Sequence, residues 1–261
     1  MTNFSFLQLA SSTTISILLF ILIIAFYILG HFFIKRAIRK DPEHINVELG
    51  SINGALLALL GLILAFSFSM ASSRFDTRRQ LVIEEANNIG TAILRTDIYP
   101  DSIRKILKSN MKEYVEERIA FYQSGMNIQK TVEHYKKADY IGKKIWAITA
   151  DYAKKDNITT RTSELIPALN AMIDITTTRR AAGESTIPDS IMYFLFILCV
   201  CSAFLLGYDN KRTIDWIILI GFTTMLTLTV FTIIDLDRPR SGLINMDGPN
   251  QKMVELRQMF E

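Results

Sequence analysis

The sequence predicts an all-α protein with four transmembrane helices and a helical soluble domain inserted between the second and third spans. The chain of 261 residues is 49% hydrophobic and 21% charged, a mixture typical of neither a soluble enzyme nor a bare membrane bundle. Apolar and charged residues are segregated along it. Four mostly apolar stretches each have about the 20 residues that a helix needs to cross a bilayer. Most charged residues lie between the second and third stretches.

These stretches divide the chain into four predicted regions. The regions are 1–71 with spans at about 13–34 and 51–71, a soluble domain at 72–186, 187–234 with spans at about 187–208 and 213–234, and a tail at 235–261. The first apolar stretch is too long for the core of a signal peptide and has no basic region before it. We therefore expect it to be the first span. An even number of spans places both termini on the same side as the soluble domain.

The soluble domain is predicted to be helical because its apolar residues recur three or four positions apart, while strand-like alternation is nowhere sustained. The apolar positions are Ile103, Ile106, Leu107, Met111, Tyr114, Val115, Ile119, Tyr122, Val132, Tyr135, Ile141, Ile145, Trp146, Ile148, Tyr152, Leu165, Ile166, Leu169, Met172 and Ile173. Residues typical of turns and helix caps predict breaks at 97–102, 123–127, 154–160 and 181–188. The second span is expected to continue as one helix from 51 to about 97.

Catalytic motifs are missing from the sequence. The histidines, His31, His44 and His134, do not have the spacing of a metal-binding motif, and no phosphate-binding loop or nucleophile elbow occurs. Cys199 and Cys201 lie two residues apart in a span, so they point to different helix faces and are expected to be packing residues. We therefore expect no enzyme activity, no metal site, no cofactor and no nucleic-acid partner.

The second span carries a strip of small residues. Gly54, Ala58, Gly61 and Ala65 are spaced by four, three and four positions, which places them on one side of a helix. Pairs of small residues four positions apart allow two membrane helices to approach closely. The strip therefore predicts a close helix contact.

Beside the strip runs a second stripe, in which large apolar residues give way to hydroxyls. It consists of Leu59, Leu62, Phe66, Ser69 and Ser73. Such a stripe could line a pore whose apolar neck closes by expelling water. Alternatively, it could pack against the other spans of the same subunit.

The charged residues after the second span also allow two interpretations. Arg74, Arg78 and Arg79 could concentrate anions at the mouth of a pore, or they could extend toward lipid headgroups. Glu84, Glu85, Asn87 and Asn88 follow on a helix that also presents apolar residues to a core. If buried, they need polar partners, and arginines are the natural candidates. After the last span, Asp235 and Asp237 could hold Arg238, cap a turn or bind a cation.

Two segments resemble a known family. The segment "LAFSFSMASSRFDTRRQLVIEEANNIGTAILRTD" is similar to the second span of the bestrophin-like family, which was formerly a domain of unknown function and is itself distantly similar to the bestrophin anion channels. The matching residues are Arg74, Arg78, Arg79, Glu85, Ala86, Asn87, Ile89, Gly90 and Thr91. The segment "DLDRPRSG" resembles the family pattern D-x-D-R-P-x-x-G, matched by Asp235, Asp237, Arg238, Pro239 and Gly242.

The resemblance implies an oligomeric anion channel, by analogy a pentamer, in the plasma (inner) membrane. It places Ala58, Leu62 and Phe66 in the hydrophobic neck of the pore, with Ser69 and Ser73 lining it beyond. It implies as partners the lipid bilayer, copies of the chain and small inorganic anions, with the soluble domain and both termini in the cytoplasm. No acidic run follows Asp237, so a calcium clasp is not implied. The alternative is a non-conducting scaffold or signalling protein, in which the long second helix transmits a signal.

Overall fold

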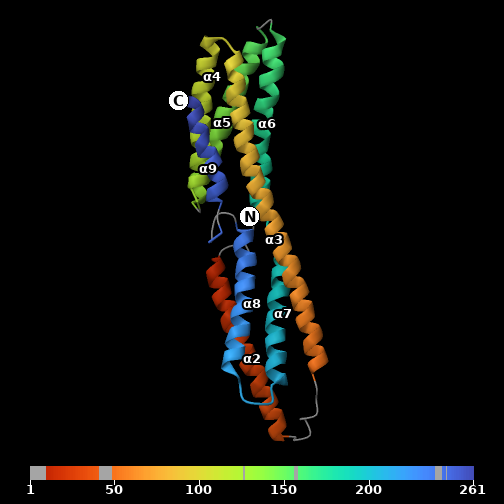
Figure 1. Ribbon diagram of the computed structural model, residues 1–261. Coiled ribbons are helices and arrows are strands. Elements are labelled where there is room, and N and C mark those ends of the chain that lie inside the picture. The colour runs from red at the N-terminus through yellow and green to blue at the C-terminus, as the bar shows by residue number, and fades with distance from the viewer. Residues whose placement is uncertain (1–9, 41–48, 126, 156–157, 239–242, 245) are drawn as a thin grey trace. The chain divides into compact units, whose positions relative to one another are not determined.

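The computed structural model describes residues 10–40, 49–125, 127–155, 158–238, 243–244 and 246–261. All regular structure in these residues is helical, as predicted (Figure 1). The elements are α2 (Ser12–Lys40), α3 (Gly50–Arg95), η2 (Thr96–Ile98), α4 (Asp101–Gln123), α5 (Ile128–Ala153), α6 (Thr159–Glu184), α7 (Asp189–Asp209), α8 (Trp216–Asp237), α9 (Asp247–Glu255) and η3 (Leu256–Phe260).

The chain forms two compact units. The apolar unit comprises the chain up to Ser73 and the segment Thr186–Arg238, and the polar unit comprises Arg74–Ser185 and the chain after Arg238. Helix α3 contributes its first part to the apolar unit and its second part to the polar unit. The described residues that follow Arg238 are grouped with the polar unit.

Helices α2, α3, α7 and α8 are long and apolar enough to cross a membrane. They coincide with the four predicted stretches, because length and hydropathy alone decide this property. The polar breaks are also confirmed: α4 ends at Gln123, α5 spans Ile128–Ala153, and α6 spans Thr159–Glu184. Asn127 caps α5 by accepting a hydrogen bond from the backbone N–H of Lys130 at 3.0 Å.

In the apolar unit, α2 packs against α7 and α8. The two backbones of α2 and α7 touch at glycines: a Cβ added to Gly30 would lie 2.1 Å from the carbonyl oxygen of Phe204, and one added to Gly207 would lie 2.0 Å from that of Tyr27. The close glycine contact of this unit is thus between α2 and α7. Small residues allow such an approach because they leave room for backbone against backbone.

Polar groups hold the ends of these helices together. The amide of Asn210 donates to the hydroxyl of Tyr27 at 2.9 Å, and the ring of His31 is hydrogen-bonded to the carbonyl of Asn210 at 2.9 Å. Asn53, on α3, donates to the carboxylate of Asp209 at 3.0 Å. The end of α7 is therefore fixed to both α2 and α3.

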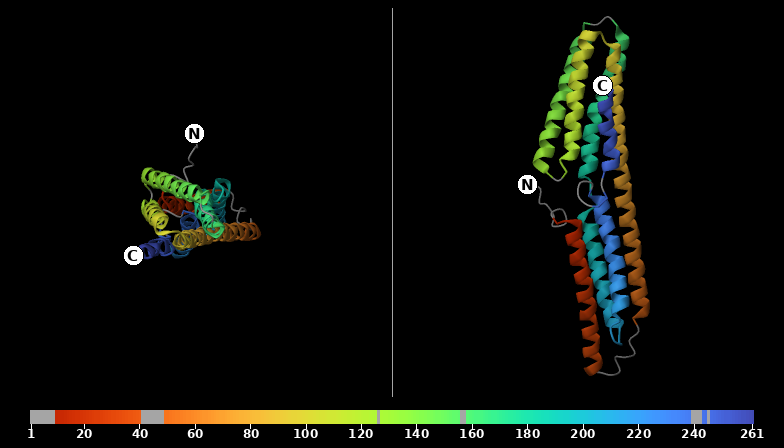
Figure 2. Two further views of the ribbon diagram at one scale, coloured as in Figure 1. Left: turned by 90° about the horizontal axis from the view of Figure 1, so that it is seen from above. Right: turned by 60° about the vertical axis from the view of Figure 1, so that its left-hand side comes forward.

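The polar unit encloses a continuous apolar core. Its buried members come from α3, α4, α5, α6, α9 and η3, among them Ile89, Ile93, Leu107, Met111, Val115, Ile145, Leu169, Met172, Met253 and Leu256. Figure 2 shows the long helices of this unit running alongside one another. Of the apolar residues whose spacing predicted these helices, Ile106, Val132 and Trp146 are exposed. They lie at the edges of their apolar stripes, and Trp146 donates from its indole to Asn170 at 3.0 Å.

Candidate functional site

The predicted pore stripe lies on the outside of the chain. Leu62 and Phe66 are 52% and 59% exposed, and Ala58, Ser69 and Ser73 are exposed as well. The other spans of the same subunit therefore leave most of this stripe uncovered. The most apolar part of α3 has 17% of its residues buried, compared with 39% for α8. The apolar part of α3 thus presents most of its surface to something other than its own chain.

The small-residue strip is also open. Gly54, Ala58, Gly61 and Ala65 are all exposed, and nothing lies within 4 Å of a Cβ added to Gly54 or Gly61. The close contact predicted for this strip does not occur at these two glycines within the described chain. The strip remains available to a second copy or to lipid.

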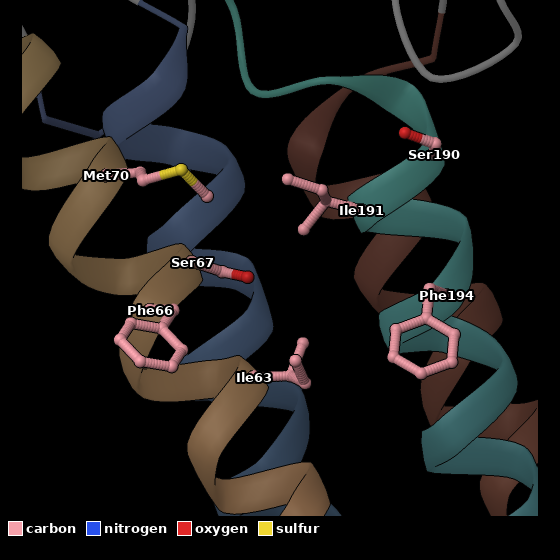
Figure 3. A pocket seen from close by; sticks show the side chains of 7 residues that line it. All are labelled: Ile63, Phe66, Ser67, Met70, Ser190, Ile191 and Phe194. Atoms are coloured by element: carbon pink, nitrogen blue, oxygen red, sulfur yellow. The ribbon is translucent and has the colours of Figure 1, made fainter.

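The opposite face of α3 is the one that packs inside the apolar unit. It is formed by Asn53, Leu60, Ser67 and Ala71, which recur seven, seven and four residues apart and are all buried. Between α3 and α7 lies a pocket of about 370 Å³, lined by Ile63, Phe66, Ser67, Met70, Ser190, Ile191 and Phe194 (Figure 3). Phe66 therefore belongs both to the predicted neck and to the wall of this pocket.

Two of the three arginines that follow the span bind the end of α6. Arg78 is buried and donates from Nε to the carbonyl of Ala182 at 3.0 Å and from Nη2 to that of Ser185. Arg74 donates to the hydroxyl of Ser185 at 2.9 Å. Carbonyls at the C-terminal end of a helix carry partial negative charge, so guanidinium groups are stabilised there. Arg79, by contrast, is exposed.

Glu85 is the centre of a buried charge network in the polar unit. It has no exposed surface, and its carboxylate accepts hydrogen bonds from Arg118 at 2.5 Å, from Arg179 at 2.7 Å and from the hydroxyl of Tyr122 at 2.7 Å. Arg118 also donates to the oxygen of Tyr122 at 2.7 Å, and its side chain is 1% exposed. The guanidinium of Arg179 lies 3.6 Å from the ring centre of Tyr122. Helices α3, α4 and α6 are thereby joined through one carboxylate.

The charges in this network stabilise one another. Burial alone would raise the pKa of Glu85, but the two arginines and the hydrogen bonds outweigh burial and hold that pKa at about 2. Burial likewise opposes the charge on Arg118, yet Glu85 raises the pKa of that guanidinium. Burial raises the pKa of Tyr122, so its hydroxyl stays protonated and able to donate. The network also reaches α9, because Arg179 donates to Asn250 at 3.2 Å.

The neighbours of Glu85 differ from it in burial. Glu84 and Asn87 are exposed, and Asn88 donates to the carbonyl of Ala171 at 3.4 Å. The partners of Glu85 are arginines, but they come from α4 and α6 and not from the nearby residues 74–79. Arg118 could have been noticed in the sequence, because it interrupts an apolar helical face.

The two acidic residues of the second predicted motif lie at the end of α8, in the apolar unit. Asp235 and Asp237 are buried at the end of α8, and Asp237 accepts a hydrogen bond from the backbone N–H of Ile187 at 2.9 Å. Arg238 donates to the carbonyl of Ala10. Asp237 therefore holds the backbone that leads into α7. Pro239 and Gly242, as well as His44, lie outside the described residues.

The remaining candidate ligands are dispersed. Cys199 is buried and Cys201 is exposed on α7, and His134 is hydrogen-bonded to Glu117 at 2.6 Å. Within the described ranges, no group of three or more His, Cys, Asp or Glu residues could hold a metal ion.

The sequence of the chain matches the model of a known protein family over most of its length. The model for the bestrophin-like domain matches residues 17–247. The chain belongs to the bestrophin-like family. No curated protein matches the sequence. Together with the four helices that are long and apolar enough to cross a membrane, this membership indicates a membrane protein.

Two solved structures share the bestrophin-like fold. Both are variants of a bacterial bestrophin homologue from Klebsiella pneumoniae, one with a tryptophan-to-alanine and the other with an isoleucine-to-threonine mutation. The first superposes with a TM-score of 0.70 at 13% identity and covers 96% of this chain and 97% of that chain. The second has a TM-score of 0.64 at 15% identity, and the match covers 91% of this chain and 98% of that chain. At this identity the likeness shows the fold alone.

Proposed function

We propose that this bestrophin-like protein is an oligomeric anion channel with an axial pore lined by α3 of each copy. The observation that carries the proposal is the exposed stripe. At about 100° per residue, Leu62, Phe66 and Ser69 lie within about 60° of one another on α3. The buried face, with Leu60 and Ser67, points to the other side. A ring of copies would therefore turn the stripe inward while each α3 stays packed on its own subunit.

The chemistry of the stripe suits a gated pore. Phenylalanine rings around a narrow passage expel water, because apolar walls cannot replace the hydrogen bonds that confined water gives up. Leu62 would form the next ring, one turn away. Ser69 and Ser73 supply hydroxyls that can hydrogen-bond an anion beyond the neck. Arg79, which is exposed, is the candidate for concentrating anions near this end of the stripe.

The test compares two phenylalanines of α3 that are both exposed. Phe66→Ala should speed chloride flux into liposomes relative to wild type, since it removes most of the apolar neck. Phe68→Ala is the matched control: Phe68 is 44% exposed but lies about 200° around the helix from Phe66, so it should leave flux unchanged. Size-exclusion chromatography must show an intact oligomer for each variant.

Several outcomes would contradict the neck assignment. One is equal flux from wild type and Phe66→Ala when both oligomers are intact. Another is faster flux from Phe68→Ala than from Phe66→Ala, which would place the pore against a different face of α3. No flux from any of the three proteins would favour the non-conducting alternative.

We also propose the plasma (inner) membrane as the location, with the polar unit and both termini in the cytoplasm and five copies in the assembly. The family resemblance supports this, and cytoplasmic exposure suits a chain whose two cysteines both lie on α7. A cysteine introduced by Lys136→Cys should resist a membrane-impermeant thiol reagent in intact cells and react after the cells are opened. Reaction in intact cells would place the polar unit outside.

A scaffold or signalling role is the second candidate function. It is favoured by α3, a single helix of 46 residues that belongs to both units. Such a helix can transmit a conformational change from the apolar unit to the polar unit. The absence of flux in the liposome experiment would support this role.

A further inference from the structure

The pocket between α3 and α7 has a mixed lining. Ile63, Phe66 and Met70 of α3 face Ile191 and Phe194 of α7, and two serines complete the wall. Figure 3 shows Ser67 pointing from α3 into the space before α7, with Ile191 pointing back toward α3. The volume of about 370 Å³ falls within the range of small-molecule sites, about 300–1,000 Å³.

Ser67 is the unusual member of this lining. It has no exposed surface, and its hydroxyl has no hydrogen-bond partner among the described residues. Some hydroxyls of the apolar unit bond to their own helix: Ser16 donates to the carbonyl of Ser12 at 2.9 Å, and Thr229 to that of Met225 at 2.9 Å. Ser202, Thr223 and Thr227 share the lack of a partner among the described residues, but they do not line this pocket. A buried hydroxyl without a partner is unfavourable in an apolar environment. The pocket therefore offers an unpaired polar group within an otherwise apolar wall.

The pocket is accessible from the surface of the apolar unit. Phe66 and Phe194, on its two sides, are 59% and 45% exposed. Both belong to helices that are long and apolar enough to cross a membrane, so in a bilayer acyl chains would reach the pocket from the α7 side, where Phe194 lies. A molecule that enters from the bilayer meets the pocket directly.

We propose that this pocket binds a single-chain amphiphile, whose alkyl chain fills the apolar part and whose hydroxyl or carbonyl oxygen pairs with Ser67. Such a ligand satisfies both features of the lining at once. An apolar side chain from a second copy would fill the volume but leave the Ser67 hydroxyl unpaired. Phe66 would touch the ligand and also face the pore, so occupancy would alter conduction. That last consequence rests on the proposed function, whereas binding itself does not.

Photolabelling of the full chain in lipid nanodiscs tests the proposal. The probes are a diazirine-bearing dodecanol and the matching dodecane, and mass spectrometry maps the labelled peptides. In wild type, the alcohol should label the segments 63–70 and 190–194 several-fold more than the alkane. Ser67→Ala should abolish this preference. Ser202→Ala should retain it, since Ser202 is equally buried and unpaired among the described residues but does not line the pocket.

A second pair of variants keeps the proposal testable if Ser67→Ala fails to fold. Ile191→Trp should fill the pocket and abolish labelling by the alcohol, whereas Ile197→Trp, at a site of α7 that is 58% exposed and outside the lining, should not. Equal labelling by both probes in wild type would overturn the proposal. So would labelling that survives Ile191→Trp, or that appears only after the oligomer dissociates, which would mean that a second copy occupies the pocket. These readouts do not depend on ion flux.

Discussion

The two units of this protein differ in whether their buried polar side chains have hydrogen-bond partners. In the polar unit, the carboxylate of Glu85 is held by Arg118, Arg179 and Tyr122. In the apolar unit, the hydroxyls of Ser67 and Ser202 are buried without a hydrogen-bond partner among the described residues, and so are those of Thr223 and Thr227 on α8. The polar unit therefore pairs its costly buried carboxylate within the chain, whereas the apolar unit has buried hydroxyls without a partner among the described residues.

The exposed surfaces of the apolar unit support the same contrast. Phe66, Ile197 and Ile217 are more than half exposed, which a bilayer or a second copy can cover. Stability of the polar unit should thus depend on pairs inside the chain, while the open strip and stripe of α3 should matter for assembly and conduction. Variants of each unit can test this division.

The largest effect is expected from breaking the Glu85 network. Glu85→Ala leaves Arg118 buried beside no carboxylate, and removing one partner of a buried ion pair costs about 3–5 kcal/mol. The matched control is Glu116→Ala. This change removes the exposed pair of Glu116 with Arg257, and exposed pairs contribute about 0–1 kcal/mol. The free energy of unfolding in detergent, measured for both variants and wild type, provides the comparison.

If the two variants lost equal stability, the buried network would not be a main source of stability in the polar unit. Loss of chloride flux by Glu85→Ala with unchanged stability would instead give Glu85 a direct part in conduction. Neither result fits a carboxylate that joins α3, α4 and α6.

The same carboxylate makes stability depend on pH. Its pKa is about 2 in the folded protein, lower than the ordinary glutamate pKa of 4.5 that applies to the unfolded chain. The folded state thus binds the proton more weakly, so this contribution is fully present above about pH 4.5 and is lost as the pH falls toward 2. The difference corresponds to about 3 kcal/mol. Thermal midpoints of wild type and Glu85→Gln should converge over this acidic range, and parallel curves would contradict the assignment.

Sequence alone was sufficient for the spans and the helix breaks, because these depend on local length, hydropathy and cap residues. The residues that pair with the Glu85 carboxylate could not be predicted in the same way. Arg118 and Arg179 lie 33 and 94 residues from Glu85, and only the tertiary fold brings them to one carboxylate. Periodicity identified the buried face of α4 as a whole, yet it could not show that Ile106 lies at the exposed edge of this face.

Glycines illustrate the same limit. The pattern on α3 shows a surface that permits close approach, but a pattern does not say which helix approaches it. Among the described residues, the close backbone approaches between α2 and α7 are those of Gly30 to Phe204 and of Gly207 to Tyr27. Gly54 and Gly61 have open space instead. Which face of α3 a second copy covers, and whether Phe66 lines a pore, depend on contacts outside one chain.

The smallest effect on the chain itself is expected at Gly61. A side chain added there meets nothing within 4 Å, so Gly61→Leu should leave the thermal midpoint of the isolated subunit unchanged. Between copies, however, a large side chain on the small-residue strip would hold two helix backbones apart, and the oligomer should shift toward smaller species in size-exclusion chromatography. Gly207→Ala provides the contrast, because its Cβ would lie 2.0 Å from a backbone oxygen. Overpacking of this kind costs about 1–3 kcal/mol or more, so Gly207→Ala should lower the thermal midpoint. An unchanged oligomer for Gly61→Leu would mean that the strip faces lipid, and the pore would then need a different interface between copies.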